Sequence, residues 1–226
     1  MDIWSIINQN VNPHLKMNVS YTIFLLSGVS LLMGCNDAKE KPAFDEVIVD
    51  GQAPENLWMK TTGDINDDGK TDMLVGGWKS GGLVAYLAPD WTKRVINDSV
   101  KISTNAEVCD VNSDKNPDIV AVVNQAIVWF AGPDWTIHHI DSVTGHDVEV
   151  HDFDGDGLLD VIARNQGAFG DKGGHTLFFY KQAPAGVWTR HEKEIADGEG
   201  LKMADINDDG EVNGADLAVL LTNWAG

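Results

Sequence analysis

The sequence predicts an all-β protein made of about three successive four-stranded units, followed by a short C-terminal loop and helix. Two landmarks recur in step. An Asp-rich loop followed by an apolar run begins at Asp64, Asp110 and Asp152, and a Trp-Thr pair follows each loop at Trp91, Trp135 and Trp188. Repetition at a fixed period of this length is typical of proteins built from stacked supersecondary units.

The composition limits the classes of partner. The 226 residues carry 35 acidic and 16 basic side chains, a net charge of −19, with 43% hydrophobic residues. Such a chain folds around a core, and nucleic acids and anionic membrane surfaces repel it. The acidic residues have three possible explanations, which are a solvated surface, cation sites or adaptation to salt.

The N-terminal residues predict an export signal. An apolar run over residues 21–33 ends at Gly34-Cys35, and its length suits the apolar core of a signal peptide better than a membrane span. Lys16 supplies the positive end if translation starts at Met1, but not if it starts at Met17. An N-terminal core helix is the alternative. The remaining cysteine, Cys109, is expected to be a lone buried thiol.

The end of this run resembles a bacterial lipobox. The resemblance implies a signal peptide over residues 1–34, acylation of Cys35 and a membrane lipid anchor. It also implies an exported lipoprotein in the periplasm, at the outer membrane or at the cell surface. Residues 35–56 would then form a polar tether, with the folded part beginning near Leu57.

Each unit is predicted to contain four short antiparallel strands. In the second unit they are expected at residues 107–109, 119–123, 126–130 and 137–140, with the acidic loop after the first strand and a Pro-Asp turn before the fourth. The loops at Asp64, Asp110 and Asp152 and a fourth loop start at Asp205 lie 42 to 53 residues apart, which is the size of a β-propeller blade. Closed propellers need at least four blades. The expected fold is therefore an incomplete propeller that is truncated, open, or closed by a second copy through its open blade edges.

The loops are predicted to bind Ca²⁺. Positions 1, 3, 5 and 9 of each loop carry side-chain oxygens, and position 6 is Gly in the first and third loops, where it allows a sharp bend. The ligands expected are Asp64, Asn66, Asp68 and Asp72, then Asp110, Asn112, Asp114 and Asp118, then Asp152, Asp154, Asp156 and Asp160. The alternative is a set of Asx turns that only satisfy their own backbone. Lys115 replaces Gly at position 6 of the second loop, which is expected to be the weakest site or empty.

This pattern over residues 57–203 resembles the FG-GAP and VCBS-type repeats of integrin-like propellers and bacterial surface proteins. The resemblance implies that Ca²⁺ binds in the hairpin loop between two strands of a blade, through the Asp and Asn residues just given.

Residues 204–226 allow two interpretations. They can begin a fourth blade, or they can form one dockerin-like EF-hand repeat with Gly210 at position 6. The EF-hand ligands at positions 1, 3, 5, 9 and 12 would be Asp205, Asn207, Asp209, Asn213 and Asp216. Leu217, Leu220, Leu221 and Trp224 follow with helical spacing, which favours the EF-hand.

Two functions follow from these features. The first is a non-catalytic calcium-binding surface module that binds a polysaccharide or a protein. The alternative is a carbohydrate-active enzyme, a polysaccharide lyase or sugar dehydratase, with acid-base candidates His146, Glu149 and Glu199 and with Glu107 nearby. Arg164, His175 and Arg190 would then bind a uronate carboxylate.

Overall fold

The computed structural model describes residues 46–79, 82–165, 176–196 and 200–204. The chain divides into two compact units, Met1–Glu46 and Val47–Gly226, and all that follows concerns the second. The predicted signal peptide, Cys35 and the EF-hand segment from Asp205 lie outside the described residues, as do His175 and Glu199.

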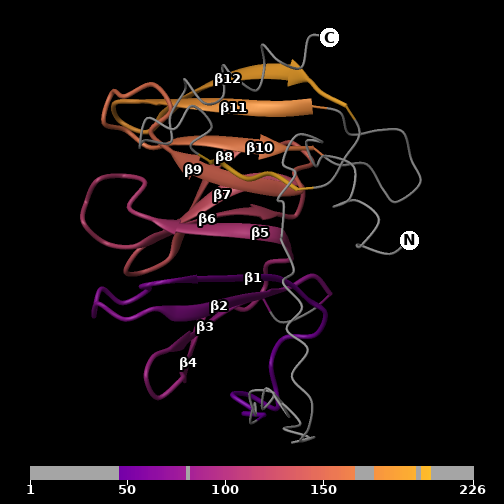
Figure 1. Ribbon diagram of the computed structural model, residues 1–226, viewed down its shortest axis with the longest axis vertical. Helices are drawn as coiled ribbons and strands as arrows, with labels where there is room; N and C mark the ends of the chain where they lie inside the picture. The colour runs from indigo at the N-terminus through magenta and orange to yellow at the C-terminus, as the bar shows by residue number, and fades with distance from the viewer. Residues whose placement is uncertain (1–45, 80–81, 166–175, 197–199, 205–226) are drawn as a thin grey trace, which may run out of the picture. The chain divides into compact units, whose positions relative to one another are not determined.

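Twelve strands form three four-stranded antiparallel sheets in the described part of the chain (Figure 1). The first sheet contains β1 (Leu57–Gly63), β2 (Asp72–Gly77), β3 (Leu83–Leu87) and β4 (Thr92–Asn97). The second contains β5 (Ile102–Cys109), β6 (Asp118–Val123), β7 (Ala126–Ala131) and β8 (Thr136–Asp141). The third contains β9 (Asp147–His151), β10 (Asp160–Arg164), β11 (Thr176–Ala183) and β12 (Val187–Glu194).

This arrangement confirms the all-β class and the three four-stranded units. All three sheets have the strand order of the sequence, with each strand paired to the next one along the chain. No sheet closes on itself among the described residues, and the propeller remains a prediction. In the second unit, β5 begins at Ile102, five residues before the expected start, because the polar stretch up to Ala106 joins the strand through an irregular register.

The burial of the strands follows their place in each sheet. The second strands β6 and β10 are rich in Val, Ile and Ala, and every residue of both strands is buried. The fourth strands lie at the sheet edges, and β12 is exposed at all but one of its positions. Charged residues on such an edge discourage pairing with other chains.

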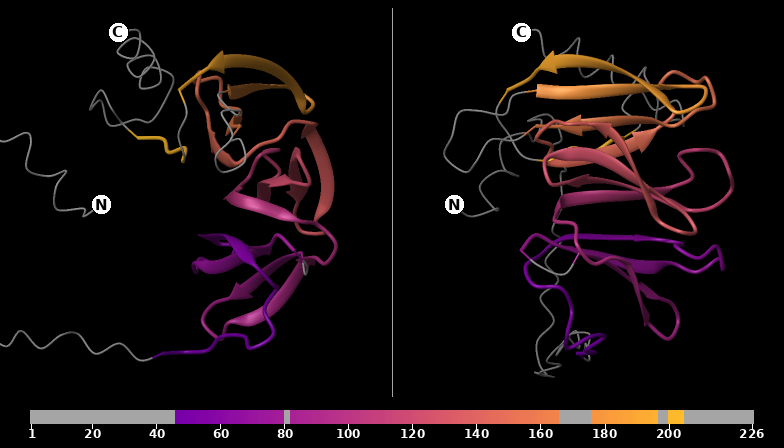
Figure 2. Two further views of the ribbon diagram at one scale, coloured as in Figure 1. Left: turned by 90° about the vertical axis from the view of Figure 1, so that its right-hand side faces the viewer. Right: turned by 180° about the vertical axis from the view of Figure 1, so that it is seen from behind.

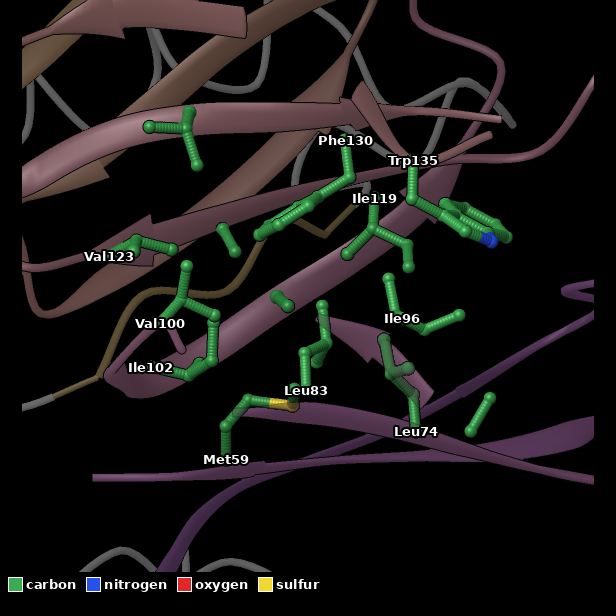
Figure 3. Packing of buried hydrophobic residues seen from close by; sticks show 14 of the residues in the cluster. Met59, Leu74, Leu83, Ile96, Val100, Ile102, Ile119, Val123, Phe130 and Trp135 are labelled. Atoms are coloured by element: carbon green, nitrogen blue, oxygen red, sulfur yellow. The ribbon is translucent and has the colours of Figure 1, made fainter. Parts of the chain in front are cut away.

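The three sheets pack against one another in chain order, with β1 in contact with β5 and β5 with β9 (Figure 2). Figure 3 shows the core between the first two sheets, where Met59, Leu74 and Leu83 meet Ile119 and Phe130. A second core between the second and third sheets contains Val120, Val122, Ile127, Val148, Val161 and Phe178. The hydrophobic faces of each pair of sheets therefore hold the repeats together.

Candidate functional site

The three Asp-rich loops connect the first strand of each sheet to the second, as expected. We call them the first loop (residues 64–72), the second loop (110–118) and the third loop (152–160). Each loop follows a strand that lies against the neighbouring sheet. Because each loop connects the first and second strands of its own sheet, all three loops lie at the corresponding end of their sheets.

The carboxylate at position 1 organises each loop by accepting backbone hydrogen bonds. In the first loop, Asp64 accepts from the N–H groups of Asp68 at 3.1 Å and Gly69 at 2.7 Å. The second loop repeats these bonds from Asp114 and Lys115 to Asp110 at 3.0 and 2.9 Å. The third loop repeats them from Asp156 and Gly157 to Asp152 at 3.1 and 2.8 Å. The same turn is thus built three times.

The carboxylate at position 5 accepts a further hydrogen bond from the backbone at position 7. The donors are Lys70, Asn116 and Leu158, at 2.9, 2.8 and 3.0 Å from the carboxylates of Asp68, Asp114 and Asp156. These are the bonds of an Asx turn. Each carboxylate oxygen has a second lone pair, so the bonds hold the oxygens in place and leave acceptor capacity for a cation.

Two positions in each loop adopt the left-handed backbone conformation. Position 6 shows the expected bend, with φ of 79° at Gly69, 73° at Lys115 and 86° at Gly157. Position 4 has the same conformation at Asp67, Ser113 and Gly155, with φ of 58°, 62° and 75°. The sequence reasoning missed position 4, for which Gly155 was the only signal. The second loop places a side chain at both positions and is the most strained.

The aspartate at position 9 braces each loop against the end of the third strand of its sheet or against the residue that follows that strand. Asp118 is fully buried and accepts from Val111 N–H at 3.0 Å and Gly132 N–H at 2.9 Å. Asp72 bonds in the same way to Ile65 and Ala88, and Asp160 to Phe153 and Gln182. Burial raises the pKa of Asp118 and of Asp160. This bracing role was not predicted.

The third loop gathers three carboxylates. Asp152, Asp154 and Asp156 each present an oxygen within 4.8 Å of the others, and Asp160 is not part of this group. The first and second loops have Asn at position 3, so they offer two carboxylates and an amide oxygen there. Lys181 on β11 donates to Asp154, and its Nζ lies 3.3 Å from Asp156. One ammonium group therefore partly balances this cluster.

Two of the candidate acid-base groups, Glu107 and Glu149, lie on the first strands of their sheets. Lys202 donates to Glu149 on β9, and its Nζ lies 3.9 Å from Glu107 on β5. Burial, with Glu149 close by, raises the pKa of Glu107. The structure therefore brings Glu107 and Glu149 to one lysine. His146 instead faces its neighbour Asp147, with 3.0 Å between Nδ1 and a carboxylate oxygen.

The two arginines expected to bind a uronate contact groups of the chain itself. Arg164 is buried and donates to the carbonyl oxygens of Ala196 at 3.2 Å and Gly200 at 3.4 Å. Arg190 forms ion pairs at 3.0 Å with Asp141 and with Glu192. Arg164 is therefore held inside the fold, and Arg190, although exposed, already pairs with two carboxylates of the chain.

A cavity of about 440 Å³ lies between the second and third sheets, beside two of the loops. Trp129 and His138 stack on its second-sheet side, with ring centroids 4.3 Å apart and planes 15° from parallel. Its lining comprises Val111, Asn112, Trp129, His138, His139, Leu158, Gln182, Pro184, Ala185, Gly186 and Trp188. The sequence reasoning missed this cavity, although the longer third unit was a signal for it.

Cys109 packs at the margin of the second core, and it is partly rather than fully buried. Burial next to Asp118 raises the pKa of its thiol to about 12. The thiol is therefore protonated and unreactive at neutral pH, as a structural cysteine would be.

No family model matches the chain, and a search of curated proteins finds no match. Within the described residues, no helix has the length and apolar character needed to cross a membrane.

Proposed function

We propose that the chain is a non-catalytic, calcium-binding module that is exported and lipid-anchored and binds a polysaccharide or a protein at the cell surface. We further propose that its repeats are of the FG-GAP or VCBS type. The observation that supports calcium is the threefold repetition of one loop geometry, in which the backbone orients the oxygens at positions 1 and 5.

Charge balance supports a divalent ion in the third loop. Three carboxylates each present an oxygen within 4.8 Å of the others there, and Lys181 supplies one positive charge. Carboxylates this close repel each other unless a cation lies between them. Calcium takes six to eight oxygen ligands in a flexible geometry, which suits carboxylate, amide and carbonyl oxygens on one loop.

Calorimetric titration of the purified full chain with Ca²⁺ tests this proposal, with a melting curve in Ca²⁺ and in chelator. We expect binding and a higher melting temperature in Ca²⁺, since an ion that binds only the native state stabilises it. Asp156→Asn should remove part of both effects. Glu194→Gln, which removes the same charge from the exposed strand β12, should keep them. Identical melting curves in Ca²⁺ and chelator would overturn the calcium proposal.

The lipid anchor is tested separately. We expect the full chain, expressed in a bacterial host with its N-terminal residues, to incorporate labelled fatty acid and to fractionate with membranes. Cys35→Ser should abolish both. A soluble, unlabelled wild-type protein would contradict the anchor and would leave the calcium proposal intact.

A specific observation keeps the enzyme as a second candidate. Glu107 and Glu149 come from different sheets and meet at Lys202, and the pKa of Glu107 is raised. A carboxyl group with a raised pKa beside a second carboxyl group is an arrangement that general acid-base catalysis uses. Release of unsaturated products from acidic polysaccharides by the wild type, lost in Glu149→Gln, would favour the enzyme. The non-catalytic proposal expects no turnover.

A further inference from the structure

The first and second sheets are sealed together by the indole of Trp135. This residue comes from the turn between β7 and β8, is 8% exposed, and belongs to the same buried cluster as Ile65 and Ile96 (Figure 3). The guanidinium of Arg94 on β4 lies over the ring, 5.3 Å from its centroid. An aromatic ring thus fills the gap beside the first loop.

The corresponding place between the second and third sheets is the cavity. Val111 has the same loop position as Ile65, and the cross-strand pair Trp129–His138 corresponds to the pair Ala85–Arg94. These second-sheet residues line the cavity. The cavity therefore occupies the position in the repeat that the indole of Trp135 fills between the first and second sheets.

The β11–β12 hairpin of the third sheet explains why no side chain fills this cavity. Strands β11 and β12 have eight residues each, whereas β7 and β8 have six. In the longer hairpin, Trp188 lies within β12, paired with Gln182, and no longer in the turn. The turn is formed instead by Pro184, Ala185 and Gly186, whose small side chains line the cavity without filling it.

The chemistry of the lining defines the ligand class. It contains two indoles, two imidazoles and two side-chain amides, and it contains no Asp, Glu, Lys or Arg. A charged ligand would find no counter-ion there, and the net charge of −19 opposes an anion further. A ring with an apolar face and a hydroxyl-bearing edge suits indole surfaces flanked by amides, and the volume falls within the range of small-molecule sites.

We propose that this cavity binds a pyranose ring of a neutral polysaccharide, with the ring packed against Trp188 and the Trp129–His138 pair. This inference rests on the proposed role as a binding module and names its ligand. The cavity adjoins two of the Asp-rich loops, because Asn112 of the second loop and Leu158 of the third loop are part of its wall.

The test is calorimetric titration of the full chain with hexasaccharides of cellulose, xylan, mannan and laminarin, with a galacturonate hexamer as the acidic probe. We expect at least one neutral hexamer to bind and the acidic one not to. Trp188→Ala should weaken binding by about tenfold or more, which corresponds to an aromatic contact of roughly 1.4 kcal/mol. The matched control is Trp91→Ala, which removes the indole of the equivalent Trp-Thr pair, exposed in the first unit.

Every outcome of these titrations either supports or overturns the proposed sugar-binding site. Binding of a neutral hexamer that Trp188→Ala weakens and Trp91→Ala preserves supports the site. Absence of neutral binding, binding of the acidic hexamer alone, or equal binding by Trp188→Ala and wild type overturns it. The Ca²⁺ titration of the same protein separates the two proposals, because glycan binding by a chain that takes up no calcium would refute the calcium loops and leave this site standing.

Discussion

The two junctions between neighbouring sheets are built from the same repeat, but they differ in what lies between the sheets. At the first junction, Trp135 is buried between the sheets, whereas at the second junction a cavity of about 440 Å³ takes its place. The strand pairs on either side are alike, so the difference comes from the length of one hairpin. A repeat can thus provide either a sealed interface or a binding site without a change of fold.

The largest expected effect on stability comes from a substitution at the junction between the first and second sheets, where Trp135 is buried. Trp135→Ala should lower the free energy of unfolding by about 3–5 kcal/mol, because it removes a buried aromatic ring and leaves a cavity. Urea denaturation measures this loss. Trp135→Phe should cost less, since the indole Nε1 has no hydrogen-bond partner among the described residues and only packing area is lost. Trp188→Ala should also cost clearly less, and equal losses at the two tryptophans would remove the distinction between the junctions.

The next effect concerns the brace behind Trp135. Asp118 accepts from Gly132, the residue that begins the turn carrying Trp135. Asp118→Asn turns one of its two acceptor oxygens into a donor, so a buried N–H loses its partner, at a cost of about 1–3 kcal/mol. Equilibrium denaturation provides the measurement. Asp134→Asn, in the same turn but exposed, serves as the control, and a similar loss there would argue against the brace.

A gain in stability is expected in the second loop. Lys115 has a φ of 73°, where the equivalent residues of the other loops are glycines. Lys115→Gly should stabilise the chain by about 1 kcal/mol, because a left-handed conformation costs a side-chain-bearing residue roughly 1–2 kcal/mol and glycine's larger unfolded-state entropy offsets part of this. It should also strengthen Ca²⁺ binding at that loop. The reverse change, Gly157→Lys, should do the opposite, and thermal melting distinguishes the two signs.

The smallest effect compares two equivalent contacts. Asp50 accepts from Tyr86 and Lys93 on the first sheet as Asp141 does from Tyr180 and Arg190 on the third. The hydrogen bond from Lys93 lowers the pKa of Asp50 to about 2. Because the folded pKa lies below the unfolded value of 3.8, this contact stabilises the fold above pH 3.8 and is lost as the pH falls toward 2. Asp50→Asn should make the free energy of unfolding, measured by denaturation at several pH values, depend less on pH in that window. An unchanged pH profile would contradict this contact.

The contact at Asp50 also ties the segment before β1 to the first sheet. Asp50 lies inside the range predicted to be a tether, yet it bonds to β3 and β4. Its partner residues are far away in the sequence, so no local pattern near Asp50 indicates the contact. The polar, proline-containing stretch up to Leu57 suggested a linker on composition alone.

Local patterns predicted most of the fold. Apolar runs, turn residues and the acidic loops predicted four strands in each unit and located those of the second, because strand and turn preferences depend on near neighbours. They also placed the loops and the bend at position 6. The bracing role of Asp118 was missed because its partner, Gly132, follows two strands later. The meeting of Glu107 with Glu149 depends on which strands of different sheets become neighbours.

The three Trp-Thr pairs show which features follow from the sequence and which depend on the tertiary structure. The sequence by itself determined that Trp91, Trp135 and Trp188 follow the same kind of strand in three repeats. Only the tertiary structure decided that Trp135 is buried, that Trp91 is 37% exposed and that Trp188 lines a cavity. The reason is that a strand forms from its own residues, whereas burial depends on which sheet packs against it and how closely.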